Sequence, residues 1–537
     1  MKKINFLLVF IIFIASALRL WQLGNVPPSP DWDEAALAYN AYSIIETGKD
    51  EYGKFLPVVL RSFDDYKPAL YTYLAVPSIL AFDVNTFSVR LPSAIFGVLT
   101  VLATYFLVFE LFKRKDLALL SSFLLAISPW HIQFSRVAFE TNVGVAFNVF
   151  AILFFLKGLK RPWLLSVSTI CMTLGIYVYQ SEKAFVPLLA LVLFFVFRKE
   201  LFSVKRIYLG VAIITGCIFI FPMFLNIVTD KNVLLRAKGV SIFTYQTAVL
   251  EDSLEKKNDD IKSGNLAGEI LHNRRVIYST DIISGYLSHF DLNWLFIKGD
   301  LIRHHAPGMG LMYLWELPFL LIGIYFLLFG NFPKKSKLFI FLWFLITPIP
   351  ASATIELPHA VRTMNFLPTF QIFVAIGLVS IYKFFLKNKI FKSLTFFYLL
   401  FAIFNFLYYL NQYFVQQNYF HSDFWQYGYK QAVEKVEKIQ DKYKKIVVSN
   451  QQPLDKSHMF FLFYMKYSPE KYQHENNLGS GYDYTHKFGK YEFRPIEWDK
   501  EDKKDVLFVG SPKDIKGGAL DTINYINGTP AIVIADR

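Results

Sequence analysis

The chain has 537 residues, of which 54% are hydrophobic and 18% aromatic, while only 18% are charged. Its apolar residues gather in blocks far longer than the core of a soluble domain needs, which excludes a purely soluble protein and predicts a membrane protein. The formal charge of +13 does not predict a nucleic-acid partner, because the basic residues lie in short loops between apolar blocks rather than on one face of a soluble domain.

An apolar block from Ile4 to Leu23 opens the chain, preceded by Lys2 and Lys3. It is long enough to cross a bilayer as a helix, which takes about 20 apolar residues. The segment from Arg19 to Trp21 stands where a signal peptide would carry small residues before its cleavage site. The pattern therefore predicts an uncleaved signal anchor.

Ten further apolar blocks have the composition of membrane spans, so we predict an all-α bundle of about eleven transmembrane helices. They run about 91–112, 117–137, 142–156, 163–179, 184–197, 207–227, 311–329, 338–355, 364–385 and 394–410. Alternate connections are short and rich in Lys and Arg, and such loops stay in the cytoplasm. We therefore expect a cytoplasmic N-terminus and an extracytoplasmic C-terminus in the cytoplasmic membrane, with function on the outer face.

Two long outer loops are predicted, at residues 24–90 and 228–310, the second of mixed charge. In the first loop, apolar residues recur at helical spacing up to Gly48 over a stretch too short to span, which predicts a helix in the membrane interface. A second interfacial or re-entrant segment is expected over residues 67–82, which are apolar but contain Pro77.

The membrane domain is expected to cover residues 1–411 and to be followed by a different kind of sequence. Residues 412–537 are polar and contain the strand-like runs KKIVVS, DVLFVG and PAIVIA, with a turn signal at Asn527-Gly528. These runs predict a small extracytoplasmic α/β domain. The only cysteines, Cys171 and Cys217, lie in apolar blocks, so neither a disulfide framework nor a cysteine metal site is expected.

The first outer loop carries three carboxylates directly after the first span, Asp31, Asp33 and Glu34. Asp31 and Glu34 have the spacing of a capping box, in which each side chain satisfies a backbone N–H at the start of a helix. Asp33 is not needed for a cap. Three carboxylates beside the membrane therefore suggest chemistry as well as structure.

Basic and polar side chains are predicted along the same outer margin of the membrane. Each of them taken alone is most simply a membrane anchor. Together they suggest a cavity with an acidic edge and a basic edge. The candidate phosphate-binding residues are Lys67, Arg136, Arg303 and Arg362. The further candidates for substrate contact, besides Asp31, are Asp65, Tyr66, Glu140, His304, His305 and His359.

Such a cavity suits the transfer of a sugar from a lipid phosphate to a hydroxyl group. The attacking hydroxyl needs a carboxylate base, and cations stabilise the charge that grows on the departing phosphate. No cofactor is required. A divalent cation is possible, but the sequence offers no clear ligand set for one. His304 and His305 are adjacent and would point in different directions on an ordered helix, so we expect no shared metal ion there.

The order of these motifs resembles the membrane glycosyltransferases of the GT-C fold, and within them the protein O-mannosyltransferase and aminoarabinose transferase group. The resemblance rests on DWDEAALAYNAYSIIETG, DDYKPALYTYL, FSVRLPSAIFGVLTVLATYFLVFELF and SPWHIQFSRVAFE, and more loosely on PHAVRTMNFLP. It implies a polyprenyl-phosphate sugar donor presented from the outer leaflet.

The resemblance also implies individual roles. Asp33 would orient or deprotonate the acceptor with Glu34 as its neighbour, and Lys67 would contact the donor phosphate, as the lysine of a Glu-Lys-Pro motif does in aminoarabinose transferases. Tyr66 stands where that motif has its glutamate. A second carboxylate there would have to come from Asp64 or Asp65.

The sequence thus predicts an inverting glycosyltransferase whose acceptor is a hydroxyl group on a protein, a lipid or a glycan. One alternative is a transporter or flippase of a lipid-linked glycan, which would place polar residues near the middle of the membrane and often show repeated halves. A second alternative is a membrane-anchored binding module whose function lies in residues 412–537.

Overall fold

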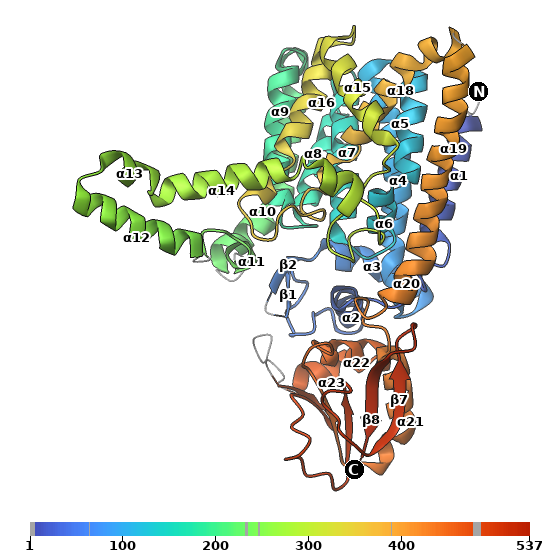
Figure 1. The fold of residues 1–537 in the computed structure, drawn as a ribbon, viewed down its shortest axis with the longest axis vertical. Coiled ribbons are helices and arrows are strands. Elements are labelled where there is room, and N and C mark those ends of the chain that lie inside the picture. The colour runs from blue at the N-terminus through green and yellow to red at the C-terminus, as the bar shows by residue number, and fades with distance from the viewer. Residues whose placement is uncertain are drawn as a thin grey trace.

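The computed structural model describes residues 6–63, 65–230, 235–244, 248–387, 389–475 and 485–536. A bundle of long helices forms the larger part, and a small sheet flanked by helices lies beyond one end of it (Figure 1). The long helices are α1 (Phe6–Leu20), α4 (Thr86–Phe112), α5 (Lys115–Ile127), α7 (Glu140–Gly158), α8 (Leu164–Ile176), α9 (Glu182–Ser203), α10 (Arg206–Thr229), α15 (Glu316–Phe329), α16 (Lys334–Ile346), α18 (Thr369–Lys387) and α19 (Lys389–Asn411).

Each apolar block predicted from the sequence overlaps one of these helices. Within the described ranges, five helical segments are long and apolar enough to cross a membrane, and α5 with the short α6 (Pro129–Ser135) makes a sixth, bent by 58° between them. Shorter apolar helices such as α1, α8 and α15 accompany them. The count of eleven spans stays a prediction.

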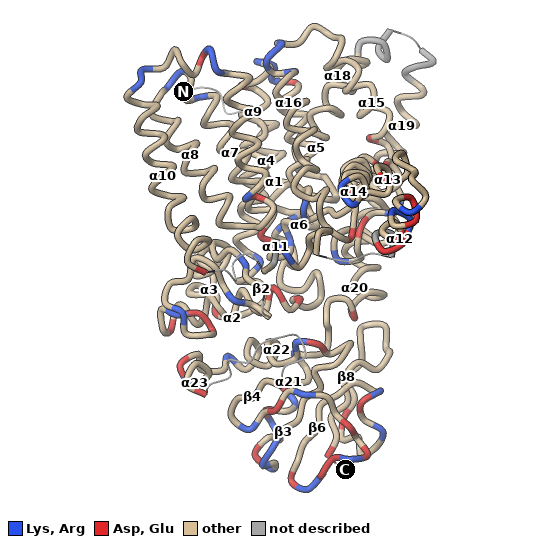
Figure 2. The backbone as a smooth tube through the Cα atoms, turned by 90° about the vertical axis from the view of Figure 1, so that its left-hand side faces the viewer, with Lys and Arg blue, Asp and Glu red and all other residues tan. Residues whose placement is uncertain are grey.

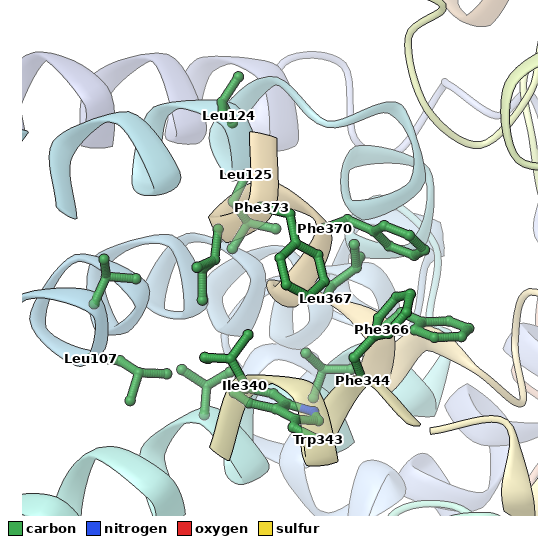
Figure 3. Packing of buried hydrophobic residues seen from close by; sticks show 14 of the residues in the cluster. Leu107, Leu124, Leu125, Ile340, Trp343, Phe344, Phe366, Leu367, Phe370 and Phe373 are labelled. Carbon is green, nitrogen blue, oxygen red and sulfur yellow. The ribbon is translucent and has the colours of Figure 1, made fainter. Parts of the chain in front are cut away.

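Aromatic and aliphatic side chains from four helices and a short 3-10 turn, Met364–Phe366, fill the bundle (Figure 3). Phe344 of α16 lies with its ring centroid 5.1 Å from that of Phe366 and 5.2 Å from that of Phe373. α15 and α18 approach each other through glycine, because a Cβ on Gly323 would lie 1.8 Å from the carbonyl oxygen of Phe373. Small residues of this kind let membrane helices pack with their backbones in contact.

The first outer loop folds between the bundle and the sheet (Figure 1). It contains α2 (Trp32–Thr47), the antiparallel strands β1 (Val59–Ser62) and β2 (Asp65–Pro68), and α3 (Leu70–Phe82). α2 ends where the sequence predicts, at Gly48, whose φ of 70° is the left-handed conformation that favours glycine. Nearly all of the first half of α2 is buried, because α3 packs against it on one side and α22 (Ser457–Met465) on another.

The second long loop forms a helical arm that projects sideways from the bundle (Figure 1). The sequence predicts only a long connection of mixed charge here. The arm consists of α11 (Leu235–Gly239), α12 (Ala248–Ser263), α13 (Leu266–Leu271) and α14 (Arg274–Ser288), followed by a π-helical turn at Trp294–Lys298. Residues 299–315 then lead back into the bundle, and a second loop with the short α17 (Ile349–Ser352) connects α16 to the 3-10 turn.

The C-terminal sheet has six strands in the order β4-β5-β3-β6-β8-β7, with β3 parallel to β5 and β6 and the other pairs antiparallel. The three strand-like runs of the sequence are β3, β6 and β8, and Asn527-Gly528 lies in the turn between β7 and β8. The elements are α21 (Tyr429–Ile439), β3 (Lys445–Val448), α22, α23 (Pro469–His474), β4 (His486–Phe488), β5 (Tyr491–Phe493), β6 (Val506–Gly510), β7 (Ala519–Asn524) and β8 (Pro530–Ala535). Before them, α19 continues through a π-helical turn, Gln412–Gln416, into α20 (Gln417–Phe420).

Charge is distributed unevenly along the molecule. Lys and Arg gather at the end of the bundle where the N-terminus lies, and the C-terminal sheet lies beyond the opposite end (Figure 2). The first outer loop is at that opposite end, beside the sheet. The predicted basic loops and the predicted functional loop are therefore separated by the length of the bundle.

Candidate active site

The start of α2 is built by the capping box that the sequence predicts. Asp31 Oδ1 accepts a hydrogen bond of 2.9 Å from the Glu34 backbone N–H, and Glu34 Oε2 accepts one of 3.2 Å from the Asp31 backbone N–H. These two bonds satisfy backbone donors that a helix N-terminus otherwise leaves without partners. They also fix the direction in which Asp33, in the same turn, points.

Glu34 has a second set of partners inside the protein. Arg90 of α4 binds both of its oxygens, Nε to Oε1 and Nη2 to Oε2, each at 2.8 Å, and the Ala138 backbone N–H donates to Oε1 at 2.8 Å. The side chains of Glu34 and Arg90 are 1% and 0% exposed. The Arg90 guanidinium also donates to the backbone carbonyls of Leu23, Pro27 and Ser29. This pair holds the first outer loop against the bundle.

Asp33 faces a different partner. Its Oδ1 accepts a hydrogen bond from Lys67 Nζ in β2, and this ion pair keeps 38% of the Asp33 side chain and 16% of the Lys67 side chain exposed. Glu140, buried at the first turn of α7, interacts electrostatically with both residues. A carboxylate and an ammonium group are thus held together where a molecule from solution can reach them.

Two more cations lie over the ring of Trp32, the residue before Asp33. The guanidinium carbon of Arg303 lies 4.1 Å from the ring centroid, and Lys456 Nζ lies 3.8 Å from it. Arg303 Nη1 also donates to Asp31 Oδ2 at 3.0 Å. Cations over an indole face are attracted by its negative π-surface, so Trp32 holds two positive groups beside Asp33.

The pKa values of the two aspartates shift in opposite directions, because burial dominates at Asp31 and the cations dominate at Asp33. Burial raises the pKa of Asp31 to about 6, although Arg303 works in the other direction. Burial alone would also raise the pKa of Asp33, but the positive charges of Lys67, Lys456 and Arg303 outweigh it, and this pKa lies below its usual value of 3.8. Asp33 is therefore ionised at neutral pH.

Asp65 and Tyr66 lie in β2 next to Lys67, where Asp65 is buried and pairs in register with Ser62 of β1. The backbone carbonyl of Tyr66 accepts a hydrogen bond of 2.6 Å from Gln180 Nε2. These contacts fix the strand that carries Lys67. Asp64, the other carboxylate considered from the sequence, lies outside the described residues.

Two of the predicted phosphate-binding arginines lie elsewhere. Arg136 is fully buried, donates to the backbone carbonyls of Leu18 and Val26 at 2.9 and 3.0 Å, and lies over the ring of Phe414. Arg362 donates to Thr354 Oγ1 at 2.7 Å and to the Ile355 carbonyl at 2.5 Å. Arg136 thus joins α1 to the first outer loop, and Arg362 joins two parts of its own loop. These hydrogen bonds are made with residues other than Asp33 and Lys67.

The histidines form a separate group behind Arg303. His304 packs between Phe134 and Phe139 and lies with its ring centroid 5.2 Å from that of His359. His305 turns toward its own loop, where its Nδ1 lies 2.8 Å from the Ala306 carbonyl. As expected for neighbours in the chain, His304 and His305 point to different surroundings.

Some residues of the site are not predicted from the sequence. Lys456 stands more than 400 positions after Asp33 in the polar C-terminal part, and only the fold brings it to Trp32. Arg90 is visible as a cation at the start of the second span, but its pairing with Glu34 is not. Asp300 beside His304 has no motif around it that would distinguish it from a surface aspartate.

Comparison with known proteins gives the same assignment as the motifs. Residues 66–224 match the sequence model of the family described as dolichyl-phosphate-mannose-protein mannosyltransferase. The structure of ArnT from Cupriavidus metallidurans in the apo state matches with a TM-score of 0.56 at 11% identity, covering 98% of this chain and 97% of that one. The fold is that of a GT-C glycosyltransferase. The resemblance inferred from the sequence is thus confirmed, and the chain is an integral membrane protein.

Further GT-C structures match in the same way. ArnT from Cupriavidus metallidurans bound to undecaprenyl phosphate gives a TM-score of 0.53 at 12% identity, again over 98% and 97% of the two chains. The archaeal oligosaccharyltransferase AglB from Archaeoglobus fulgidus gives 0.49 at 13% identity and matches 85% of this chain. The chain spans only 63% of the length of AglB. Among curated proteins, no significant match is found.

Proposed function

We propose that this GT-C protein transfers a sugar from a polyprenyl-phosphate donor to an acceptor hydroxyl group with inversion at the anomeric carbon. The observation that carries the proposal is the Asp33 carboxylate, paired with Lys67 and flanked by Arg303 and Lys456. The family match to mannosyltransferases supports sugar transfer as the reaction class. The undecaprenyl phosphate bound by ArnT supports a lipid phosphate as the leaving group.

An apolar cavity lined in part by the residues that follow Lys67-Pro68 supports a lipid donor. Its volume is about 500 Å³, and it lies between the first outer loop and helices α8 and α10. Ala69 and Leu70, which follow Lys67-Pro68 in the chain, are among its lining residues, together with Leu56, Pro57, Tyr73 and Tyr177. A prenyl chain in this cavity would bring its phosphate to the Lys67 ammonium group.

The reaction needs one proton acceptor and several positive charges. The acceptor oxygen attacks the anomeric carbon, the bond from that carbon to the phosphate oxygen breaks, and the hydroxyl proton passes to Asp33. Lys67, Arg303 and Lys456 stabilise the charge that remains on the lipid phosphate, which needs no general acid to depart. A single displacement of this kind inverts the configuration.

The ion pair between Asp33 and Lys67 also suggests how the base is activated. A donor phosphate beside Lys67 gives that ammonium group a second anion to neutralise. Its hold on Asp33 weakens, and the pKa of Asp33 rises toward its ordinary value because one of the charges that lower it is now shared. The carboxylate therefore becomes a better proton acceptor when the donor is bound.

The charge distribution of the protein supports an orientation in the membrane. The basic loops gather at the end of the bundle opposite to Asp33 (Figure 2), and such loops stay in the cytoplasm. We therefore place the site and residues 412–537 on the outer face of the cytoplasmic membrane, with the acceptor a protein, a lipid or a glycan on that side.

The test uses purified protein in lipid nanodiscs with a panel of polyprenyl-phosphate-linked radioactive sugars and hydroxyl acceptors. We expect Asp33→Asn to lower transfer by roughly 10²–10⁴-fold, the usual contribution of a general base. Asp116→Asn, which removes an exposed carboxylate at the start of α5, is the matched control and should transfer normally. Full transfer by Asp33→Asn would reject the proposal, and movement of the donor between leaflets without a transfer product would favour a flippase.

A further inference from the structure

We propose that Asp300, His304 and His359 form a binding site for a divalent transition metal ion. This site is separate from Asp33 and its ion-pair partner Lys67. One ligand atom from each of the three residues lies within 4.8 Å of the others. Asp300 and His304 come from the segment that leads back from the helical arm, and His359 comes from the loop before the 3-10 turn at Met364. The site therefore joins two segments that are far apart in the chain.

The first argument is that two imidazole nitrogens are buried with few or no polar partners. Nδ1 of His359 has no hydrogen-bond partner among the described residues, and Nδ1 of His304 has only the Asp300 carboxylate, at 3.5 Å. The side chain of His304 is 10% exposed, and that of Asp300 is 4% exposed. A buried polar atom without a partner costs free energy, and a metal ion would satisfy both nitrogens at once.

The second argument is the orientation of the carboxylate. Asp300 Oδ2 accepts a hydrogen bond from the Ala360 backbone N–H, while Oδ1 lies 3.5 Å from His304 Nδ1. One oxygen is thus held by the protein and the other faces the imidazole. Carboxylates that bind metal ions are oriented by outer hydrogen bonds of this kind.

Two neighbouring histidines, His289 and His305, differ from His359 because their Nδ1 atoms contact backbone carbonyls. His289 Nδ1 lies 2.7 Å from the Gly285 carbonyl, and its Nε2 accepts a hydrogen bond from the His359 backbone N–H. His305 Nδ1 lies 2.8 Å from the Ala306 carbonyl and 2.9 Å from the Met309 carbonyl. Both rings are held by backbone groups, so neither is needed to complete the ligand set.

The nearby cations are engaged with other groups. Arg362 donates to Thr354 and Ile355, and Arg303 donates to Asp31. Two imidazoles and one carboxylate form a ligand set of the kind that zinc and other first-row transition metals prefer over magnesium or calcium. Three protein ligands leave a coordination position for water.

The metal ion would act on the active site through Arg303. His304 follows Arg303 directly, and Gln133 Nε2 of α6 donates to the Arg303 backbone carbonyl at 2.9 Å. A metal bound to His304 and His359 would fix this segment on both sides and hold the Arg303 guanidinium over Trp32. Its role is positional, because the three ligands do not contact Asp33 or Lys67 in the described structure.

The experiment measures zinc binding by the purified full-length protein without any sugar donor. The protein is treated with EDTA, dialysed and equilibrated with Zn²⁺, and bound zinc is measured by mass spectrometry. We expect about one zinc ion per chain, the loading of a single site with three protein ligands. His304→Gln and His359→Gln should each weaken binding by more than roughly 100-fold, because even indirect partners of a metal site contribute 10–100-fold.

His305→Gln is the matched control, since it removes an adjacent imidazole whose Nδ1 is already held by the backbone. It should bind zinc like the unchanged protein. In the unchanged protein Co²⁺ should give the visible absorption of a bound ion, and this spectrum carries the test if a ligand variant does not fold. Zinc well below one per chain, or equal affinity in His304→Gln and His305→Gln, would overturn the proposal. Neither result bears on sugar transfer, which the Asp33 experiment tests separately.

Discussion

The first turn of α2 supplies the carboxylates of two ion pairs, Glu34–Arg90 and Asp33–Lys67. The two pairs differ in burial and in the number of hydrogen bonds made by the carboxylate. Glu34 and Arg90 are buried, and every oxygen of the carboxylate is engaged by the protein. Asp33 and Lys67 form one contact and remain partly exposed. A carboxylate with several fixed partners cannot exchange them without loss of stability, whereas an exposed one can release its partner to a substrate. Of these two neighbouring acids, Glu34 is fixed by the protein, and Asp33 is the one that we propose reacts.

The largest effect should come from breaking the buried pair. Arg90→Ala leaves the Glu34 carboxylate buried without its counter-ion, which typically costs about 3–5 kcal/mol in the free energy of unfolding. Thermal unfolding in detergent measures this loss. Arg114→Ala is the control, because it breaks an exposed pair with Asp116 and should cost at most about 1 kcal/mol. Equal stability of the two variants would remove the distinction between the buried and the exposed pair.

Lys67→Ala should have the opposite effect: little loss of stability and a large loss of sugar transfer. The protein should unfold at nearly the same temperature, because a partly exposed ion pair contributes about 1 kcal/mol or less. The value of kcat/KM for sugar transfer should fall by roughly 10²–10³-fold, since one donor to a developing anion contributes about 2.7–4 kcal/mol. Lys67→Arg should recover part of the loss by keeping the charge. A variant that lost stability but kept its transfer rate would contradict the proposed role.

Lys456→Ala should have a smaller effect on catalysis. Lys456 contributes charge from the C-terminal part and is held by the Trp32 ring as well as by Asp455. We expect roughly a tenfold loss in kcat/KM, which corresponds to about 1.4 kcal/mol. Lys444→Ala, which removes an exposed lysine directly before β3, should leave the kinetics unchanged. The same result for both lysines would place Lys456 outside the active site.

The smallest expected effect is that of Asp31 on the pH dependence of stability. Because the pKa of Asp31 is raised from 3.8 to about 6 by burial, the folded protein binds more protons than the unfolded chain between these values. The contribution of Asp31 to the free energy of unfolding is therefore greatest at low pH and decreases as the pH rises toward 6. Asp31→Asn keeps an N-cap side chain but does not titrate, so its unfolding temperature should lack this decrease. Parallel curves for the two proteins from pH 4 to pH 6 would contradict the assignment.

The helices were predictable because hydrophobic length and loop charge depend only on local sequence. The capping box at Asp31 and Glu34 and the helix end at Gly48 were predictable for the same reason. The three runs that form β3, β6 and β8 were also visible as strands. The choice of Asp33 and Lys67 as candidates needed the family resemblance as well, because composition alone does not separate a reactive aspartate from a cap.

The remaining features depend on contacts between distant parts of the chain. The sequence does not indicate that Arg136 donates to the backbone carbonyls of Leu18 and Val26. It also does not indicate that His304 would meet His359 rather than its neighbour His305. The helical arm was missed because α12 is polar and because no described helix of the arm is long and apolar enough to span.

The packing of α22 and α23 on α2 has a consequence for biosynthesis. Tyr39 donates to the Tyr467 carbonyl, and Gln473 Nε2 donates to Ser43, Thr47 and the Asp50 carbonyl. The first outer loop is translated among the first hundred residues, but these partners follow every apolar block in the chain and leave the ribosome after them. A nascent or truncated chain can thus have all its apolar blocks in the bilayer and still lack the cover over α2. The ordering of the start of α2 is therefore coupled to completion of the whole polypeptide.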